Sequence, residues 1–489
     1  MMKTTIIQLP EIVVTLQTNN AMNVISKEIW RGSVRLPSLP RVLLKNLSPL
    51  DALYLRQKVI SCNYFYKHRI DRQTLKKSVL KLLKVYPFLC GRVINNNPFL
   101  SRNMFSNFAI ASSEKVAVPI VYKQVQSKHT FEEILCDFDD VHNNFVELTS
   151  AYKISQGKDA PMTLSVTQFN GEGHEDDRGC ILGVSISHGL VDGFSFHKIV
   201  KLLAKIYNNN GDEDASLIEY NGDRYYQELT QEYRKCSLHI NDMASDSVQT
   251  VNYSAYYKCF MLKLFLYLES TAEASFAKNN KQCRTRVSFT NSDLRMIERS
   301  KHGDNFSSVG DNIVSSLLAS MYQDKPLPKT LAMTINMRSP RIYCLDDNYI
   351  GNAVHTIYEQ GHSSASTFAN IMERIVRLKR QLYPNSIDVI REEFYQNLNL
   401  LENNITSAPH SLHRDVIFIN NQLSFPMLPS FGLHNKCMRA IPGKGDDIHI
   451  IPSAKKGIDV YVSQSTMPRK MTSSALKRNI LAKYEKDFP

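Results

Sequence analysis

The sequence has no long apolar segment and no regular cysteine pattern, and each absence narrows the class of protein. The most apolar late stretch, residues 259–268, is too short to cross a bilayer and contains Lys263. Residues 1–20 carry a short apolar pattern broken by Pro10 and Glu11, without a cleavage site of the A-x-A kind. The nine cysteines are scattered with no C-x-x-C pair, which argues against zinc and is typical of reduced core residues. We therefore expect no signal peptide, no membrane span, no bound metal and a cytoplasmic location.

Familiar nucleotide and metal motifs are also missing. There is no P-loop, no G-x-G-x-x-G after a strand pattern, no H-E-x-x-H and no internal repeat. The formal net charge is +12, yet Lys and Arg are spread along the chain without a dense run or interleaved aromatic residues. This distribution argues against nucleic-acid binding and is typical of a basic solvated surface, part of which can meet phosphate groups. We expect no permanently bound cofactor.

What the sequence does contain is a mixture of strand and helix patterns in two similar-sized halves. At 489 residues, 43% hydrophobic and 22% charged, the chain is globular and long enough for two or three domains. Apolar periodicity and capping residues predict helices over residues 71–86, 291–299, 311–322, 365–383 and 473–484, and another that ends near residue 207. Alternation and turn residues predict strands over residues 116–122, 162–168, 180–187, 286–289, 331–336, 416–423, 437–441, 448–452 and 457–463. These patterns predict an α/β fold with mixed sheets, divided into residues 1–215, a crossover at 216–280 and residues 281–489.

The most informative stretch is His188-Gly-Leu-Val-Asp192-Gly193. It follows the apolar run of residues 180–187 and precedes an amphipathic helical pattern, so His188 lies where a strand gives way to a loop and a helix. A histidine at such a position can act as a general base, because an imidazole with its ordinary pKa of about 6.5 takes up a proton near neutral pH. The alternative is structural: a histidine that caps backbone groups, with Asp192 as the N-cap of the next helix.

Together with four other segments, this motif resembles the BAHD family of acyl-CoA-dependent acyltransferases, whose central motif is His-x-x-x-Asp-Gly. Tyr86-Pro87 and Gly91-Arg92 stand where the family has the same pairs. The matching segments, in chain order, are Leu47–Asp51, Leu75–Val93, Asn336–Val354 and Asn420–Leu433. The resemblance therefore extends from about residue 45 to the C-terminus.

This resemblance implies a fold and an activity. The family has two pseudo-equivalent chloramphenicol-acetyltransferase-like domains with a tunnel between them, which places His188 at its centre. The implied reaction moves an acyl group from acyl-CoA, a co-substrate, to a hydroxyl or amine of a small molecule, without a covalent enzyme intermediate. The resemblance also implies a monomer of secondary metabolism. Two alternatives stay open, namely a condensation-type enzyme that takes its acyl group from a carrier-protein thioester, and a non-catalytic binding protein on the same fold.

The resemblance also assigns expected roles to individual residues. Asp192 is expected to point away from the base and to pair with Arg338, whereas a triad arrangement would have it orient the imidazole. Gly193 gives the backbone room beside the loop. The oxyanion that forms on the thioester needs hydrogen-bond donors, and the candidates are Asn420, Asn421 and Gln422. The candidates for contact with CoA are Ser315, Ser316, Lys281, Arg284 and Arg286.

One family segment is degenerate in this chain. Where the family has Asp-Phe-Gly-Trp-Gly, this sequence has Ser430-Phe431-Gly432-Leu433-His434, so the acid, the Trp and the last Gly are absent. Phe431 and Gly432 are expected to be structural, as the family segment is. For His434, and for His197 on the helix after the central motif, a structural or surface position is the expected one.

Overall fold

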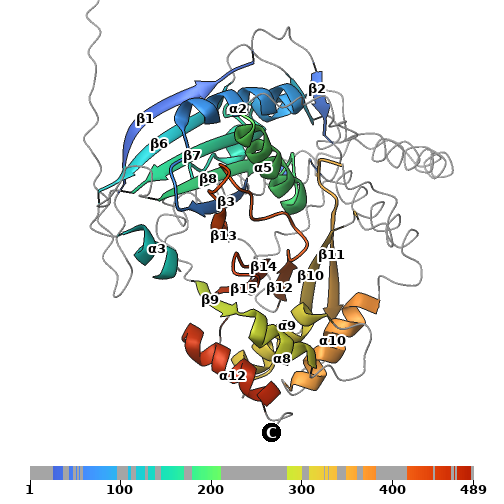
Figure 1. Ribbon diagram of the computed structural model, residues 1–489. Coiled ribbons are helices and arrows are strands. Elements are labelled where there is room, and N and C mark those ends of the chain that lie inside the picture. Colours follow the sequence, from blue (N-terminus) through green and yellow to red (C-terminus); the bar gives the residue numbers. More distant parts are fainter. Residues whose placement is uncertain are drawn as a thin grey trace, which may run out of the picture.

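The first half of the chain forms a six-stranded mixed sheet (Figure 1). In spatial order its strands are β1 (Ser26–Val34), β6 (Val118–Val125), β7 (Met162–Gln168), β8 (Cys180–Ser187), β3 (Val59–Tyr66) and β13 (Cys437–Pro442). β6 and β7 are parallel, and the other neighbours are antiparallel. The predicted pairing of residues 162–168 with residues 180–187 is confirmed. β13 comes from the last part of the chain, so the second half completes the sheet of the first.

The computed structural model describes only part of the chain. The described residues are 26–36, 43–47, 51, 54–55, 59–95, 108–111, 117–126, 130–137, 145–169, 179–210, 284–299, 308–323, 325–328, 330–336, 338, 349–360, 367–380, 416–443, 447–463, 467 and 471–485. The predicted crossover at 216–280 lies outside them, and the predicted domain boundaries stay predictions. Within these ranges, no helix has the length and apolar character needed to span a membrane.

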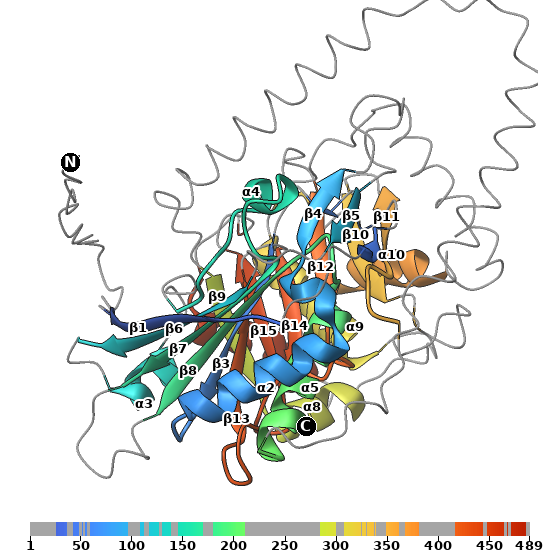
Figure 2. The same ribbon diagram turned by 90° about the horizontal axis from the view of Figure 1, so that it is seen from above.

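Two helices, α2 (Arg72–Val85) and α5 (Gly193–Asn208), lie side by side along the first sheet (Figures 1 and 2). α2 starts where the Asp71 carboxylate accepts a hydrogen bond from the Thr74 amide, the usual way to satisfy a free N–H at a helix start. The buried residues of each helix recur at helical spacing and pack into one hydrophobic core with the sheet. The predicted helix over 71–86 is therefore confirmed to within one residue at each end.

The second half forms another six-stranded mixed sheet. Its strands, in spatial order, are β11 (Val354–Gln360), β10 (Thr330–Asn336), β12 (Val416–Asn421), β14 (Ile448–Pro452), β15 (Ile458–Ser463) and β9 (Arg284–Phe289). Its helices are α8 (Asn291–Arg299), α9 (Val309–Met321), α10 (Phe368–Arg380) and α12 (Ser473–Glu485). They gather beside this sheet, where a second hydrophobic core forms (Figure 1). The two-domain α/β fold expected from the sequence is confirmed.

Smaller elements complete the described structure. A three-stranded sheet joins β2 (Leu43–Asn46), β5 (Phe108–Ala111) and β4 (Arg92–Asn95). Short helices are the 3-10 helix η1 (Pro87–Cys90), α3 (Phe131–Asp137) and α4 (Ala151–Ser155). For the site, what matters is that the turn between β8 and α5 meets the chain that connects β10 to β11. The two halves therefore touch where the His-x-x-x-Asp-Gly motif lies.

Candidate active site

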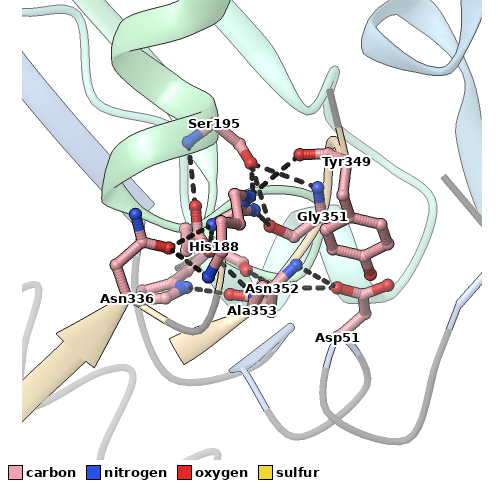
Figure 3. A network of polar contacts seen from close by, with 10 residues as sticks. Asp51, His188, Ser195, Asn336, Tyr349, Gly351, Asn352 and Ala353 are labelled. Atoms are coloured by element: carbon pink, nitrogen blue, oxygen red, sulfur yellow. Dashed lines mark hydrogen bonds and ion pairs between the residues drawn. The ribbon is translucent and has the colours of Figure 1, made fainter. Parts of the chain in front are cut away.

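His188 lies directly after the last residue of β8 and is buried, with 8% of its surface exposed. Its Nδ1 is 3.0 Å from Oδ1 of Asn352, which lies just before the start of β11 (Figure 3). The Tyr54 ring stacks on the imidazole, with ring centroids 4.2 Å apart and planes 11° from parallel. The ring is thus held on one edge by the second half and on one face by the first.

The sequence places the histidine here because β8 is buried along its whole length and a tight turn follows. The Leu190 amide donates to the Ser187 carbonyl across this turn. A Cβ on Gly189 would lie 2.6 Å from the Leu55 Cα atom, a separation that no side chain tolerates. Glycine at this position therefore lets the turn pack directly against the segment that carries Tyr54.

Asp192 serves two purposes at the start of α5. Its Oδ1 accepts from the Ser195 amide at 2.8 Å, which caps the helix. Its Oδ2 accepts from Nη1 of Arg338 at 2.7 Å and from the Ala353 amide at 2.8 Å. Both charged side chains are completely buried. The expected ion pair is therefore present, and the carboxylate faces Arg338 while the Nδ1 of His188 faces Asn352.

Arg338 uses its whole guanidinium group at this junction. Besides Asp192, its Nη1 donates to Asn336 Oδ1, while its Nε donates to the Tyr349 carbonyl. Its Nη2 donates to the Ser195 hydroxyl at 2.7 Å and to the Gly351 carbonyl at 2.9 Å. A buried ion pair is tolerated when its remaining donors are satisfied, and this one ties the start of α5 to the chain before β11.

Asn352 and Asp51 form a second polar link beside the first. The Asn352 Nδ2 donates to Asp51 Oδ1 and to the His188 carbonyl, both at 2.7 Å, and its backbone amide donates to the same Asp51 oxygen at 3.1 Å. All three residues are buried. Asp51 and Asn352 both lie in segments that resemble the family, but the resemblance assigns neither residue a role. The only sequence signal for either was its place in such a segment.

The three candidates for binding the oxyanion lie in different places in the structure. Asn421 places its Nδ2 2.9 Å from where a Cβ of Gly310 would be, next to the start of α9. Gln422 instead directs its Nε2 to within 3.4 Å of the equivalent position on Gly193, the first residue of α5. Its Oε1 is buried without a hydrogen-bond partner among the described residues. Asn420 lies within β12, opposite His449 of β14. Of these three, Gln422 reaches the central motif.

Glycine at position 193 allows the chain that follows β12 to come close to the start of α5. A Cβ there would lie 3.1 Å from the Phe425 ring, closer than most real contacts. The Phe425 ring also packs edge-on against Phe194, at a centroid distance of 5.5 Å. The expected role of Gly193, which is room beside the loop, fits this close contact between the start of α5 and the chain that follows β12.

The candidates for CoA contact do not join this network. Ser315 donates to the Met372 sulfur, and Ser316 shares a hydrogen bond with the Tyr484 hydroxyl, so both lie between α9 and its neighbouring helices. Arg284 donates to the carbonyls of Pro442 and Gly443, which ties β9 to the end of β13. These hydroxyls and this guanidinium have structural bonds inside the protein, and their geometry gives no support for contact with a ligand.

The two other basic candidates are Arg286 and Lys281. Arg286 is 3.5 Å from the Asp459 carboxylate, in the pair of β9 and β15. Lys281 lies outside the described residues.

The degenerate segment forms a structural loop at the end of α5. The Phe431 ring is buried, with its centroid 5.6 Å from that of Tyr66 and 5.3 Å from that of Tyr207. Gly432 has φ of 107°, in the region that favours glycine. Asn208 closes the loop: its Oδ1 accepts from the Gly432 amide at 2.6 Å, and its Nδ2 donates to the Ser430 carbonyl. The loop is therefore held without the acid and the Trp of the family segment.

His197 lies on the buried side of α5. Its Nδ1 is 2.8 Å from the Tyr64 hydroxyl, and desolvation lowers its pKa to about 3. It is a neutral histidine with a hydrogen-bond partner in the core, as expected. Among the described residues, no group of His, Cys, Asp and Glu side chains is arranged to hold a metal ion.

Two of three comparisons with known proteins find matches. A family model described as the Transferase family matches residues 33–473. Among solved structures, that of vinorine synthase aligns with a TM-score of 0.59 at 15% identity, covering 94% of this chain and 98% of that one. TRI101 of F. sporotrichioides, complexed with coenzyme A and T-2, aligns with a TM-score of 0.57 at 13% identity, covering 91% and 97%.

A further similar structure is that of a condensation domain. The first condensation domain of the calcium-dependent antibiotic synthetase aligns with a TM-score of 0.56 at 10% identity, covering 91% of this chain and 97% of that one. At these identities the structures establish the fold alone. A search of curated protein sequences finds no match.

Proposed function

Since this chain belongs to the Transferase family, the family of BAHD-type acyltransferases, we propose that it transfers an acyl group from acyl-CoA to a hydroxyl or amine of a small molecule. The observation that carries the proposal is the placement of His188. It is buried at the junction of the two halves, with one ring nitrogen bonded to Asn352 and one face against Tyr54. The imidazole therefore lies where the two halves meet, beside the hydrogen bonds of Asn352 with Asp51.

The proposed reaction uses the ring nitrogen of His188 that is not bonded to Asn352. An alcohol or amine is a weak nucleophile until it loses its proton, and His188 takes that proton as the acceptor attacks the thioester carbonyl. The tetrahedral intermediate then breaks its C–S bond, and the imidazolium returns the proton to the departing thiolate. The acyl group passes directly from sulfur to the acceptor, so no covalent enzyme intermediate forms.

We assign the oxyanion to Gln422 rather than to Asn420 or Asn421. Its amide lies against Gly193 at the start of α5, and it is buried, with 6% of its surface exposed. A donor already oriented in a site that excludes water stabilises a developing negative charge strongly, because it needs no reorganisation when the charge appears. Asn421 lies instead against Gly310, next to α9.

A carrier-protein thioester is the second candidate for the acyl donor. Two observations favour it: Ser315, Ser316 and Arg284 already have intramolecular bonds, and the fold is shared with a condensation domain. The chemistry at the thioester carbonyl is the same for both donors, so the donor has to be identified by binding.

Thermal stability with and without ligand tests the donor without knowledge of the acceptor. A ligand that binds only the folded protein raises its melting temperature. We expect free CoA and acetyl-CoA to raise the melting temperature of the wild-type protein and of His188→Ala alike, because the base does not hold the nucleotide. Absence of any shift at saturating CoA contradicts the acyl-CoA donor and favours the carrier protein.

A further inference from the structure

We propose that Asp51 and Asn352 are positioning residues that set the tautomer and the proton affinity of His188. On this view, the base carried by the first half works only when the second half supplies Asn352. The inference rests on the proposed function for its catalytic meaning, although its physical content concerns the imidazole alone.

The hydrogen bonds of Asn352 determine which way its amide points. The atoms 2.7 Å from its Nδ2 are the Asp51 carboxylate oxygen and the His188 carbonyl oxygen. The backbone amide of Asn352 donates to that same Asp51 oxygen, so this oxygen acts as an acceptor. Two acceptors require the NH₂ group on that side of the side chain. The Asn352 Oδ1 must therefore face His188.

This orientation fixes the imidazole tautomer. The Asn352 Oδ1 can only accept, so the His188 Nδ1 that lies 3.0 Å away must carry the hydrogen. The lone pair of the neutral ring is then on Nε2, and Nε2 is the atom that takes the proton in the proposed reaction. The tautomer is thus assigned from the surrounding network, as such assignments have to be.

The charge of Asp51 reaches His188 through a neutral amide. In a triad the carboxylate contacts the imidazole directly, whereas here Asn352 lies between the two groups. The negative charge stabilises the protonated ring, and the intervening amide weakens this effect. Among the described residues, the buried ion pair of Asp192 and Arg338 also lies near His188, and its two charges neutralise each other at 2.7 Å. The Tyr54 ring stacks on the face of the imidazole.

The arrangement also links the two halves of the chain. Asp51 precedes β3 of the first sheet, and Asn352 precedes β11 of the second, 301 residues later. Figure 3 shows Asn352 between Asp51 and His188. Asn352 Oδ1, the hydrogen-bond acceptor for Nδ1 of His188, belongs to the second half. A displacement of the second half that breaks this contact leaves Nδ1 without that acceptor. The proton affinity of the base therefore depends on how the halves dock.

Nitrogen NMR of the full chain labelled with ¹⁵N-histidine tests this inference, and it needs neither an acyl donor nor an acyl acceptor. The His188 signals are identified as those lost in His188→Ala. Asp51→Asn removes the charge and keeps an acceptor for both N–H groups of Asn352, so we expect the His188 titration midpoint to fall by about one pH unit. In the exchanged pair Asp51→Asn with Asn352→Asp, the carboxylate contacts Nδ1 directly, and we expect the midpoint to rise above that of the wild type.

Glu359→Gln is the matched control, because it neutralises another buried carboxylate, the one paired with Arg374 in the second half. It is expected to lower stability and to leave the His188 midpoint unchanged. Shifts in opposite directions for the single and the exchanged variants, with the hydrogen on Nδ1 in the wild type, support the inference. A hydrogen on Nε2, or a midpoint that neither variant moves, overturns it. Failure of CoA to bind, with these shifts present, contradicts the proposed function and leaves the inference standing.

Discussion

Asn substituted for Asp192 should destabilise the protein far more than a change at an ordinary surface carboxylate. Asn keeps the shape of the side chain and remains a good N-cap, so α5 keeps the acceptor for the Ser195 amide. What disappears is the charge opposite Arg338, whose side chain is completely buried, together with the second carboxylate oxygen, which accepts from Arg338 and from the Ala353 amide. Removing one partner of a buried ion pair leaves an uncompensated charge in the core and costs about 3–5 kcal/mol. We expect a loss of that size for Asp192→Asn.

Two further variants separate the contribution of the buried charge from that of the helix cap. Asp192→Ala also removes the cap and should cost about 1 kcal/mol more than Asp192→Asn. The double variant Asp192→Ala with Arg338→Met removes both charges, so it should be more stable than Asp192→Ala alone. The measurement is the free energy of unfolding from denaturant titration, with soluble yield and turnover recorded in parallel. A fully stable Asp192→Asn protein that is merely slow would refute a structural role for this ion pair.

Three other predictions concern stability and catalysis. Gly432→Ala should lower the free energy of unfolding by about 1–2 kcal/mol in denaturant titration, because φ of 107° disfavours a side chain; the neighbouring control Leu433→Ser, at a side chain 87% exposed, should stay within about 0.5 kcal/mol. Burial lowers the pKa of His197 to about 3, below its value of 6.5 in the unfolded chain. Its contribution to stability is therefore complete above pH 6.5 and is lost as the pH falls from 6.5 to about 3. His197→Gln should therefore show a shallower acid dependence of unfolding free energy by up to about 1.4 kcal/mol per pH unit, and an unchanged slope would contradict this. Gln422→Ala should lower kcat by about a hundredfold or more with little change in the melting temperature, whereas Asn421→Ala should leave kcat near the wild-type value.

Local signals explain most of what the sequence predicts correctly. The helix behind Asp71 and the strand of residues 180–187 are confirmed because capping, apolar periodicity and buried runs act within a few residues. β13 shows where such signals end: residues 437–441 do form a strand, but nothing in their own pattern indicates pairing with β3 of the first sheet. β3 and β11 are absent from the sequence predictions, although both flank the site.

The same distinction applies to the site. His188 and Asp192 lie in one short motif, and Arg338 lies in a recognisable segment, so all three are found from the sequence. The contact of Asn352 with Asp51 joins residues 301 positions apart, and no local pattern reveals it. The structure gives no support for contact between Ser316 and CoA, because the Ser316 hydroxyl is hydrogen-bonded to that of Tyr484. Tyr484 reaches Ser316 through the packing of α12 on α9, which no local pattern in the sequence indicates.

We propose that His188 acts as the base in direct acyl transfer. The most direct test incubates wild-type protein and His188→Ala with isotopically labelled acetyl-CoA and a library of alcohols and amines, and measures by mass spectrometry both the acylated products and the intact protein. We predict labelled product from the wild type, a loss of about 10²–10⁴-fold in His188→Ala, and no label on either protein. Equal product from the two proteins would contradict the role of His188 as the base. An acyl group attached to the wild-type chain as an intermediate would contradict direct transfer.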